Sequence, residues 1–222
     1  RPRLERHEWQ ACLDRAASLA VRDGYCVASG SLPSGVPEDF YGTVVDIARR
    51  KGAKLVLDTS GPALGAALQR GIHLVKPSLG ELEALVGRKL PDEASQEQAV
   101  RELVLSGAAE MVALTLGRDG ALLVTDRGAL RLPAPDVIAK SAVGAGDSFV
   151  AALTLGLAQG RSPEDAFAYG TAAGAAAVLT AGTGLCRRED VERLYLEIGN
   201  TRHSGQSPSA AGSPVDDLDR DQ

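Results

Sequence analysis

The chain turns at Ser141-Ala142-Val143-Gly144-Ala145-Gly146-Asp147-Ser148-Phe149-Val150, and a pattern rich in Ala and Leu then continues to about Ala158. Glycine at 144 and 146 permits a tight turn and leaves no side chain over the start of the helix that this pattern predicts. The first amides of an α-helix have no partner within the helix, and the helix dipole is positive at that end. The turn therefore predicts an anion-binding site at the start of the helix.

Asp147 has two interpretations at this position. Its carboxylate can cap the helix that follows, which acidic side chains near a helix start commonly do. It can also act as a base beside a phosphate that is bound to the free amides. The motif alone leaves both interpretations open, so the choice between them depends on the rest of the chain.

The composition is that of a globular protein. The chain has 222 residues, of which 44% are hydrophobic and 24% are charged, enough for one domain with its own core. The formal net charge is −5 and the basic residues are scattered, so we expect no nucleic-acid partner. No apolar run is long enough to cross a bilayer, so we expect no membrane association. The three cysteines fit neither a disulfide framework nor a zinc site, and we expect free thiols in a reducing cytoplasm.

Short apolar runs alternate with segments of helical spacing. The predicted strands are 25–28, 54–58, 72–77, 110–116 and 121–125, with 130–132 pairing next. The predicted helices are 7–20, 40–51, 63–70, 80–86, 95–106, 145–158, 163–179 and 188–198. This alternation predicts an α/β fold with a mostly parallel sheet that is covered on both faces, the strand 25–28 being buried like the others.

Four loops follow predicted strands, at 29–37, 76–81, 115–120 and 141–147. In open α/β sheets ligands bind beyond the carboxyl ends of the strands. We therefore expect these four loops to converge on one edge of the sheet.

The loop Lys76-Pro77-Ser78-Leu79-Gly80-Glu81 carries a cation, a hydroxyl and a carboxylate. A nucleotide site with a hydrated magnesium ion needs such groups, because Mg²⁺ keeps most of its waters. The same residues are also compatible with a plain helix start, where Glu81 interacts favourably with the helix dipole.

The other loops are less specific. Thr115-Leu116-Gly117-Arg118-Asp119-Gly120 could bring bare amides to phosphate oxygens, or could be only a hairpin turn. Ser29-Gly30-Ser31-Leu32-Pro33 could bind a sugar or its phosphate, or could be a plain loop. Asp58 could orient a ligand or cap the next segment. The chain has neither a Gly-x4-Gly-Lys-Ser/Thr loop nor a Gly-x-Gly-x-x-Gly after its first strand, which argues against a Walker-type ATPase and a standard dinucleotide enzyme.

Taken together, the four loops resemble those of the PfkB (ribokinase) family of carbohydrate kinases, and the resemblance extends from about Tyr25 to about Glu197. Its most specific part is 143–149, which is close to that family's signature. The segments 29–36, 75–77, 80–82 and 182–186 are most similar to the minor bacterial 6-phosphofructokinase branch, whose relatives include fructose-1-phosphate and tagatose-6-phosphate kinases. The resemblance implies a three-layer ribokinase-like fold.

The resemblance also implies roles for individual residues. Asp147 would be the general base that takes the proton from the sugar hydroxyl, and Gly144, Ala145 and Gly146 would form the anion hole for the transferring γ-phosphoryl group. Ser31 would contact the phosphate of the sugar.

Nucleotide and metal contacts follow from the same resemblance. The residues that would line the ATP and Mg²⁺ site are Lys76, Ser78, Glu81, Thr115, Gly117 and Gly120. Among them, Glu81 would hold Mg²⁺ through water. Ser78 stands where the family usually has Asn in an Asn-x-x-Glu motif, and since a serine can still bind water we expect weakened Mg²⁺ handling. Family members often bind a potassium ion beside the anion hole, and its ligands, mostly backbone carbonyls, would be Ser141, Val143, Ala177, Thr180, Gly182 and Gly184.

The implied activity is ATP-dependent phosphorylation of a small sugar phosphate, namely conversion of fructose 6-phosphate to fructose 1,6-bisphosphate, a glycolytic reaction. Two alternatives stay open. One is a kinase for another acceptor, which could be fructose 1-phosphate, tagatose 6-phosphate, ribose or a nucleoside. The other is a truncated nucleotide-binding fragment without catalysis.

The domain organisation predicted from the sequence and from this resemblance has two parts. Residues 1–199 would be part of a ribokinase-like kinase domain, the half that binds nucleotide and carries the base, and 200–222 would be a disordered tail because it has almost no apolar residues. The chain begins with Arg1, and the family's first strands and its small β lid have no match here, so we expect a longer kinase. Because the lid usually forms the dimer interface, the resemblance implies a homodimer for the full-length protein and gives no oligomeric state for this chain.

Overall fold

The computed structural model describes residues 3–182 and 184–204. Within them, a sheet of six strands follows the order β1-β2-β3-β4-β5-β6. The strands are β1 (Tyr25–Ser29), β2 (Lys54–Asp58), β3 (Ile72–Val75), β4 (Ala109–Thr115), β5 (Ala121–Thr125) and β6 (Gly128–Leu132). The first four are parallel, and β5 and β6 are antiparallel to their neighbours. The carboxyl ends of β1 to β4 therefore share one edge of the sheet.

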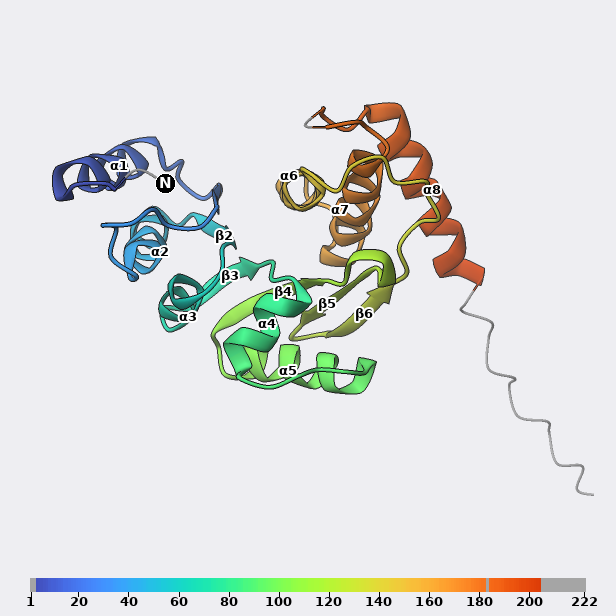
Figure 1. The fold of residues 1–222 in the computed structure, drawn as a ribbon, viewed down its shortest axis with the longest axis horizontal. Helices are drawn as coiled ribbons and strands as arrows, with labels where there is room; N and C mark the ends of the chain where they lie inside the picture. Colours follow the sequence, from blue (N-terminus) through green and yellow to red (C-terminus); the bar gives the residue numbers. More distant parts are fainter. Residues whose placement is uncertain (1–2, 183, 205–222) are drawn as a thin grey trace, which may run out of the picture.

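Helices cover both faces of this sheet (Figure 1). On one side lie α2 (Phe40–Arg50), α3 (Pro62–Leu68), α4 (Leu79–Val86) and α5 (Glu93–Leu105), with α1 (Arg6–Leu19) packed on α2. On the other side lie α6 (Ala145–Ala158), α7 (Pro163–Val178) and α8 (Arg188–Ser204). A one-turn 3₁₀ helix, η1 (Gly117–Asp119), links β4 to β5. This is the three-layer α/β arrangement with a mostly parallel sheet that the alternation predicts.

Each face of the sheet has its own apolar core. Leu57, Leu64 and Leu82 are fully buried on the side of α2 to α5. Phe149 and Phe167 pack edge to face on the side of α6 to α8, with ring centroids 5.8 Å apart. The central strands are buried on both faces, which explains why their sequences read as continuous apolar runs.

The packing of α6 on α7 is unusually close. A Cβ atom at Gly170 would lie 2.9 Å from Cβ of Leu153 and 3.0 Å from the carbonyl oxygen of Phe149, and one at Gly156 would lie 3.0 Å from Cβ of Ala166. The small residues of α7 allow the two helices to pack this closely. The close packing of α6 on α7 fixes where α6 begins.

Three sequence predictions need correction. The strand β1 is half-buried rather than buried, and Val27 is 48% exposed, because among the described residues β1 pairs with β2 alone. The turn at 117–120 is a 3₁₀ helix over three of its residues. The helix predicted to end at 198 continues to Ser204, so 200–204 are helical rather than part of a tail, and the rest of the predicted tail, 205–222, lies outside the described residues.

Two further findings concern the part of the chain that the structure describes. Its cysteines, Cys12, Cys26 and Cys186, are free thiols. No described helix combines the length and the apolar character needed to cross a membrane.

Gly170→Ala should lower the free energy of unfolding. The added methyl group would collide with backbone and side-chain atoms of α6, and overpacking of this kind typically costs about 1–3 kcal/mol. Urea denaturation measures the loss. Gly65→Ala in α3 is the matched control, because its Cβ would meet only Leu85 at an ordinary 3.8 Å, and it should be neutral or stabilising by up to about 1 kcal/mol. Equal effects of the two substitutions would contradict the close packing.

His73 should make the fold sensitive to acid. Its Nδ1 lies 2.7 Å from Oε2 of Glu110 and its buried Nε2 has no hydrogen-bond partner among the described residues. Burial lowers the pKa of His73, an effect that Glu110 opposes only in part. The unfolded chain then binds this proton more readily, so stability present above a pH of about 6.5 decreases as the pH falls below it.

Urea unfolding at pH 7.5 and pH 5.5 measures this loss. His73→Gln should reduce the difference between the two pH values, whereas His7→Gln, at an exposed position on α1, should leave it unchanged. A His73→Gln variant that loses as much stability as the parent would show that another group is responsible.

Candidate active site

The first turn of α6 presents unpaired backbone amides. Gly144 adopts a left-handed conformation, with φ of 80°, and turns the chain into the helix. The first amide with a helical partner is that of Ser148, which donates to the Gly144 carbonyl at 2.9 Å. Within the described residues no carbonyl accepts from the amides of Ala145, Gly146 or Asp147, and no side chain caps the helix. Unpaired amides at the positive end of a helix dipole are the groups that the predicted anion site requires, and the anion site itself stays a prediction.

The carboxylate of Asp147 is exposed and does not cap α6. Its side chain starts one residue after Gly146 in the first turn, so it lies beside the free amides and not in the protein interior. Of the two sequence interpretations, the capping role is therefore absent from this structure, and the carboxylate is free to meet a ligand.

Lys76 follows β3 and its side chain is only 7% exposed. Its Nζ lies 3.1 Å from Oδ1 of Asp58, at the end of β2, and 3.8 Å from the point where a Cβ of Gly146 would lie. Two strand ends and the start of α6 thus meet at one ammonium group, as expected if the loops converge.

Asp58 is a site residue whose role the sequence left open. Burial raises the pKa of its carboxyl, the ammonium of Lys76 opposes that rise, and the negative charges of Glu81 and Asp147 add to it. The carboxylate of Asp58 pairs with Lys76 and does not cap α3, while its role in orienting a ligand stays a prediction. The pairing of Asp58 with Lys76 follows from the strand register. Leu57 is opposite Val75, so Asp58 and Lys76 end adjacent parallel strands.

Ser78 and Glu81 hold each other at the start of α4. The Ser78 amide donates to Oε2 of Glu81 at 2.7 Å, and the Glu81 amide donates to Oγ of Ser78 at 3.4 Å. This reciprocal capping box is the plain helix start that we considered. It engages one oxygen of the Glu81 carboxylate and keeps that carboxylate close to Asp58.

The loop after β4 is tied to the loop after β3. The amide and the hydroxyl of Thr115 both donate to the Pro77 carbonyl, at 2.9 and 3.4 Å. Gly117 is exposed and has φ of 62°. Gly120 has φ of 97°, and a side chain there would collide with the Leu132 carbonyl. The positive φ favours glycine at both positions, and at Gly120 the hairpin also leaves no room for a side chain.

The loop after β1 is fixed by its first glycine. The Gly30 carbonyl accepts from the hydroxyls of Tyr41 at 2.6 Å and Thr59 at 2.9 Å, and the Gly30 amide donates to the Asp58 carbonyl at 2.9 Å. The next residue, Ser31, is exposed. It therefore lies near the strand end that carries Asp58.

The two segments that we expected to bind potassium lie side by side. Oγ of Ser141 donates to the Gly182 carbonyl at 3.0 Å and accepts from the Val143 amide at 3.2 Å. The Ala177 carbonyl accepts from the Thr180 amide at 3.1 Å. Gly184 follows in the same loop, and Thr183 lies outside the described residues.

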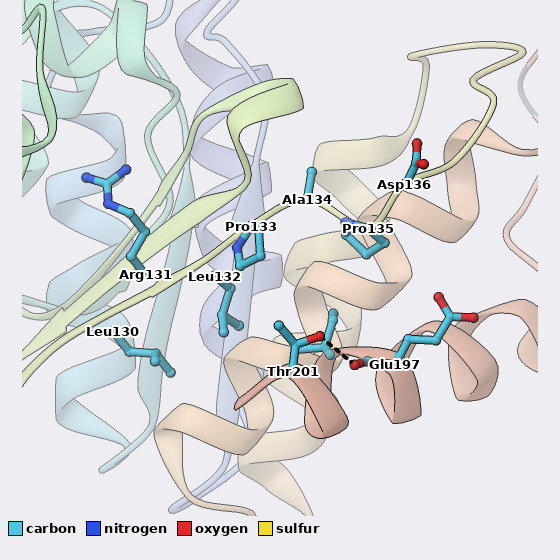
Figure 2. A pocket seen from close by; sticks show the side chains of 10 residues that line it. Leu130, Arg131, Leu132, Pro133, Ala134, Pro135, Asp136, Glu197 and Thr201 are labelled. Carbon is cyan, nitrogen blue, oxygen red and sulfur yellow. Dashed lines mark hydrogen bonds between the residues drawn. The ribbon is translucent and has the colours of Figure 1, made fainter. Parts of the chain in front are cut away.

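A groove of about 500 Å³ has walls that include none of these residues, although Gly120 packs against its lining residue Leu132 (Figure 2). Its walls come from the end of β6, the segment that follows it and the last turns of α8: Leu130, Arg131, Leu132, Pro133, Ala134, Pro135, Asp136, Glu197, Ile198 and Thr201. Figure 2 shows prolines and aliphatic side chains along it. None of the predicted site residues is among the residues that line the groove.

Comparison with known proteins identifies relatives over most of the chain. Residues 3–190 match the family described as pfkB family carbohydrate kinase. ATP-dependent 6-phosphofructokinase isozyme 2 of Mycobacterium tuberculosis is 45% identical over 205 residues, which are 92% of this chain and 60% of that relative. A 1-phosphofructokinase of Rhodobacter capsulatus is 44% identical over 132 residues, which are 58% of this chain and 42% of that relative.

The crystal structure of phosphofructokinase-2 from Escherichia coli in complex with potassium superimposes with a TM-score of 0.85 at 38% identity. The match covers 89% of this chain and 64% of that one. It confirms the predicted ribokinase-like α/β fold. The chain spans about 60% of the length of the first relative above. By the extent and the strength of these matches, the chain belongs to the pfkB family of carbohydrate kinases.

Proposed function

We propose that this chain supplies the nucleotide-binding and catalytic-base part of an ATP-dependent kinase that converts fructose 6-phosphate to fructose 1,6-bisphosphate. The observation that supports this most directly is the start of α6, where an exposed carboxylate lies beside three unpaired amides and near a buried ammonium group. Phosphoryl transfer needs positioned reactants and stabilised negative charge more than covalent chemistry. One helix start offers both.

In this mechanism Asp147 accepts the proton of the sugar hydroxyl as the hydroxyl oxygen attacks the γ-phosphorus of ATP. The bond from that phosphorus to the β,γ-bridging oxygen breaks, and ADP leaves. The amides of Ala145, Gly146 and Asp147, together with the α6 dipole, stabilise the charge on the transferring group. Preorganised donors of this kind contribute roughly 3–4 kcal/mol each. Lys76 adds a positive charge at the phosphates, and the loop of Thr115, Gly117 and Gly120 lines the nucleotide. Ser31 contacts the phosphate of the sugar.

The residues present fit a hydrated magnesium ion. The described residues contain no group of three His, Cys, Asp or Glu side chains that could hold a metal ion alone. Glu81 offers one carboxylate, and the Ser78 hydroxyl stands beside it. Mg²⁺ commonly binds through waters, substrate phosphates and one or two carboxylates. When bound, it would neutralise charge on the phosphates, with Glu81 holding one of its waters.

A potassium ion is the second proposed cofactor. Ser141 and Gly182 bring the two candidate segments within one hydrogen bond of each other, directly before the turn at Gly144. Carbonyl oxygens have two lone pairs, so those of Gly182 and Ala177 can bind a cation in addition to their hydrogen bonds. The E. coli relative described above was solved with potassium. We also propose a homodimer for the full-length kinase and a cytoplasmic location.

A second candidate acceptor is fructose 1-phosphate, favoured by the similarity to 1-phosphofructokinase. A third candidate is a nucleotide-binding fragment without catalysis, because the chain spans only about 60% of its first relative.

Asp147→Asn should nearly abolish phosphoryl transfer in the kinase that contains this chain. Loss of the general base should lower kcat by about 10²- to 10⁴-fold, while the amides of α6 and therefore ATP affinity remain. A coupled assay of ADP production measures kcat. Ser31→Ala is the comparison, because Ser31 should change mainly the KM for the sugar phosphate. A normal kcat for Asp147→Asn would remove the mechanism.

The acceptor and the activity of the chain are tested together. In the full-length kinase, fructose 6-phosphate should give the highest kcat/KM among fructose 6-phosphate, fructose 1-phosphate, tagatose 6-phosphate and ribose. The 222-residue chain alone should bind ATP in calorimetry and transfer phosphate poorly, since closure over the substrate excludes water in such reactions. A full-length protein that binds ATP and phosphorylates none of these sugars would favour the fragment without catalysis.

A further inference from the structure

The charges around Lys76 are unbalanced in a way that the proposed function does not explain. Asp58, Glu81 and Asp147 all act on this part of the site, and Lys76 is the ammonium group buried among them. Of the three carboxylates, Asp58 is the one in contact with it, at 3.1 Å, and its side chain is 16% exposed. The proposed function uses Glu81 and Asp147 and leaves Asp58 without a role.

The position of Lys76 is unfavourable without Asp58. Its ammonium lies against the start of α6, where the helix dipole is positive and three amide hydrogens are unpaired. These groups repel a cation. The carboxylate of Asp58, 3.1 Å from the ammonium, offsets that repulsion. Asp58 is held there by the backbone of β2, which pairs with the strand that ends before Lys76.

Asp58 therefore does more than pair with a neighbour. We propose that Asp58 is a positioning residue that holds the Lys76 ammonium at the amino end of α6, so that the lysine and the free amides bind one and the same phosphate group. This inference rests on the proposed function, because it requires a nucleotide phosphate at that helix. It assigns Asp58 no contact with the nucleotide and no part in proton transfer.

A double-mutant cycle tests the proposal, with calorimetric binding of ATP and Mg²⁺ to the 222-residue chain as the readout. Asp58→Asn should weaken ATP binding by about 10- to 100-fold, the range typical of a partner that orients a ligand-binding side chain. Lys76→Met should weaken it at least as much. In the Lys76→Met background, Asp58→Asn should have no further effect, because Asp58 acts only through the lysine. Asp58→Glu, which keeps the charge, should recover most of the affinity.

Asp46→Asn is the matched control. Asp46 pairs with Arg70 at 2.6 Å on the outer surface of α2, so this variant also removes one carboxylate from an ion pair and should bind ATP like the parent. Circular dichroism shows whether each variant is folded. If Asp58→Asn alone does not fold, Lys76→Met is compared with the double variant, which has no unpaired buried charge. Equal ATP affinities of those two support the proposal, and a weaker double variant overturns it.

The outcomes separate this inference from the proposed function. If the parent chain binds ATP and the two substitutions are additive, Asp58 acts independently of Lys76 and the positioning role is wrong while the kinase proposal stands. If the parent chain does not bind ATP, the proposed function fails, and the positioning role fails with it.

Discussion

The proposed phosphate site depends on the amides at the start of α6, which have no acceptor among the described residues. Their position is set by close packing some distance away. Gly170 lets α7 approach the backbone of α6, and Gly156 does the same near the other end of the helix. The left-handed conformation of Gly144 then turns the preceding chain into the helix. Small residues are therefore needed both where the helix packs and where it begins.

Charge at this edge is distributed so that the anion site stays open. Lys76 pairs with Asp58, and the two remaining carboxylates, Glu81 and Asp147, are close enough to Asp58 to act on it electrostatically. Without the lysine, three negative charges would lie at a site that accepts a polyanion in the proposed reaction. Without Asp58, a buried cation would oppose the helix dipole. These charges balance one another only when all four side chains are present. The four residues come from three different loops.

Local patterns were sufficient for most of the fold and for the start of α6. Apolar runs and helical spacing predict the strands and helices because both are properties of neighbouring residues. The half-buried state of β1 was not predictable, since the composition of Tyr25 to Ser29 does not say how many neighbours a strand has. The extra turns of α8 were missed because polar residues dominate them. The contact of Asp58 with Lys76 depends on strand order and register, which cannot be inferred from neighbouring residues in a single sequence.

The same physics of helix starts gives different results at different helices of this chain. At α4 the Ser78 hydroxyl and the Glu81 carboxylate satisfy exposed amides, and Asp92 and Ser162 do so at α5 and α7. A cap of this kind typically stabilises a helix by about 1 kcal/mol. At α6 a carboxylate is present within the first turn and yet does not cap. Gly144 has no side chain that could cap, and Asp147 stands at the same third helical position as Glu81 in α4 and yet does not cap. The stability of a cap is therefore forgone where a buried ammonium group also lies near the helix start. A helix start of that kind is better explained by a bound anion than by folding alone.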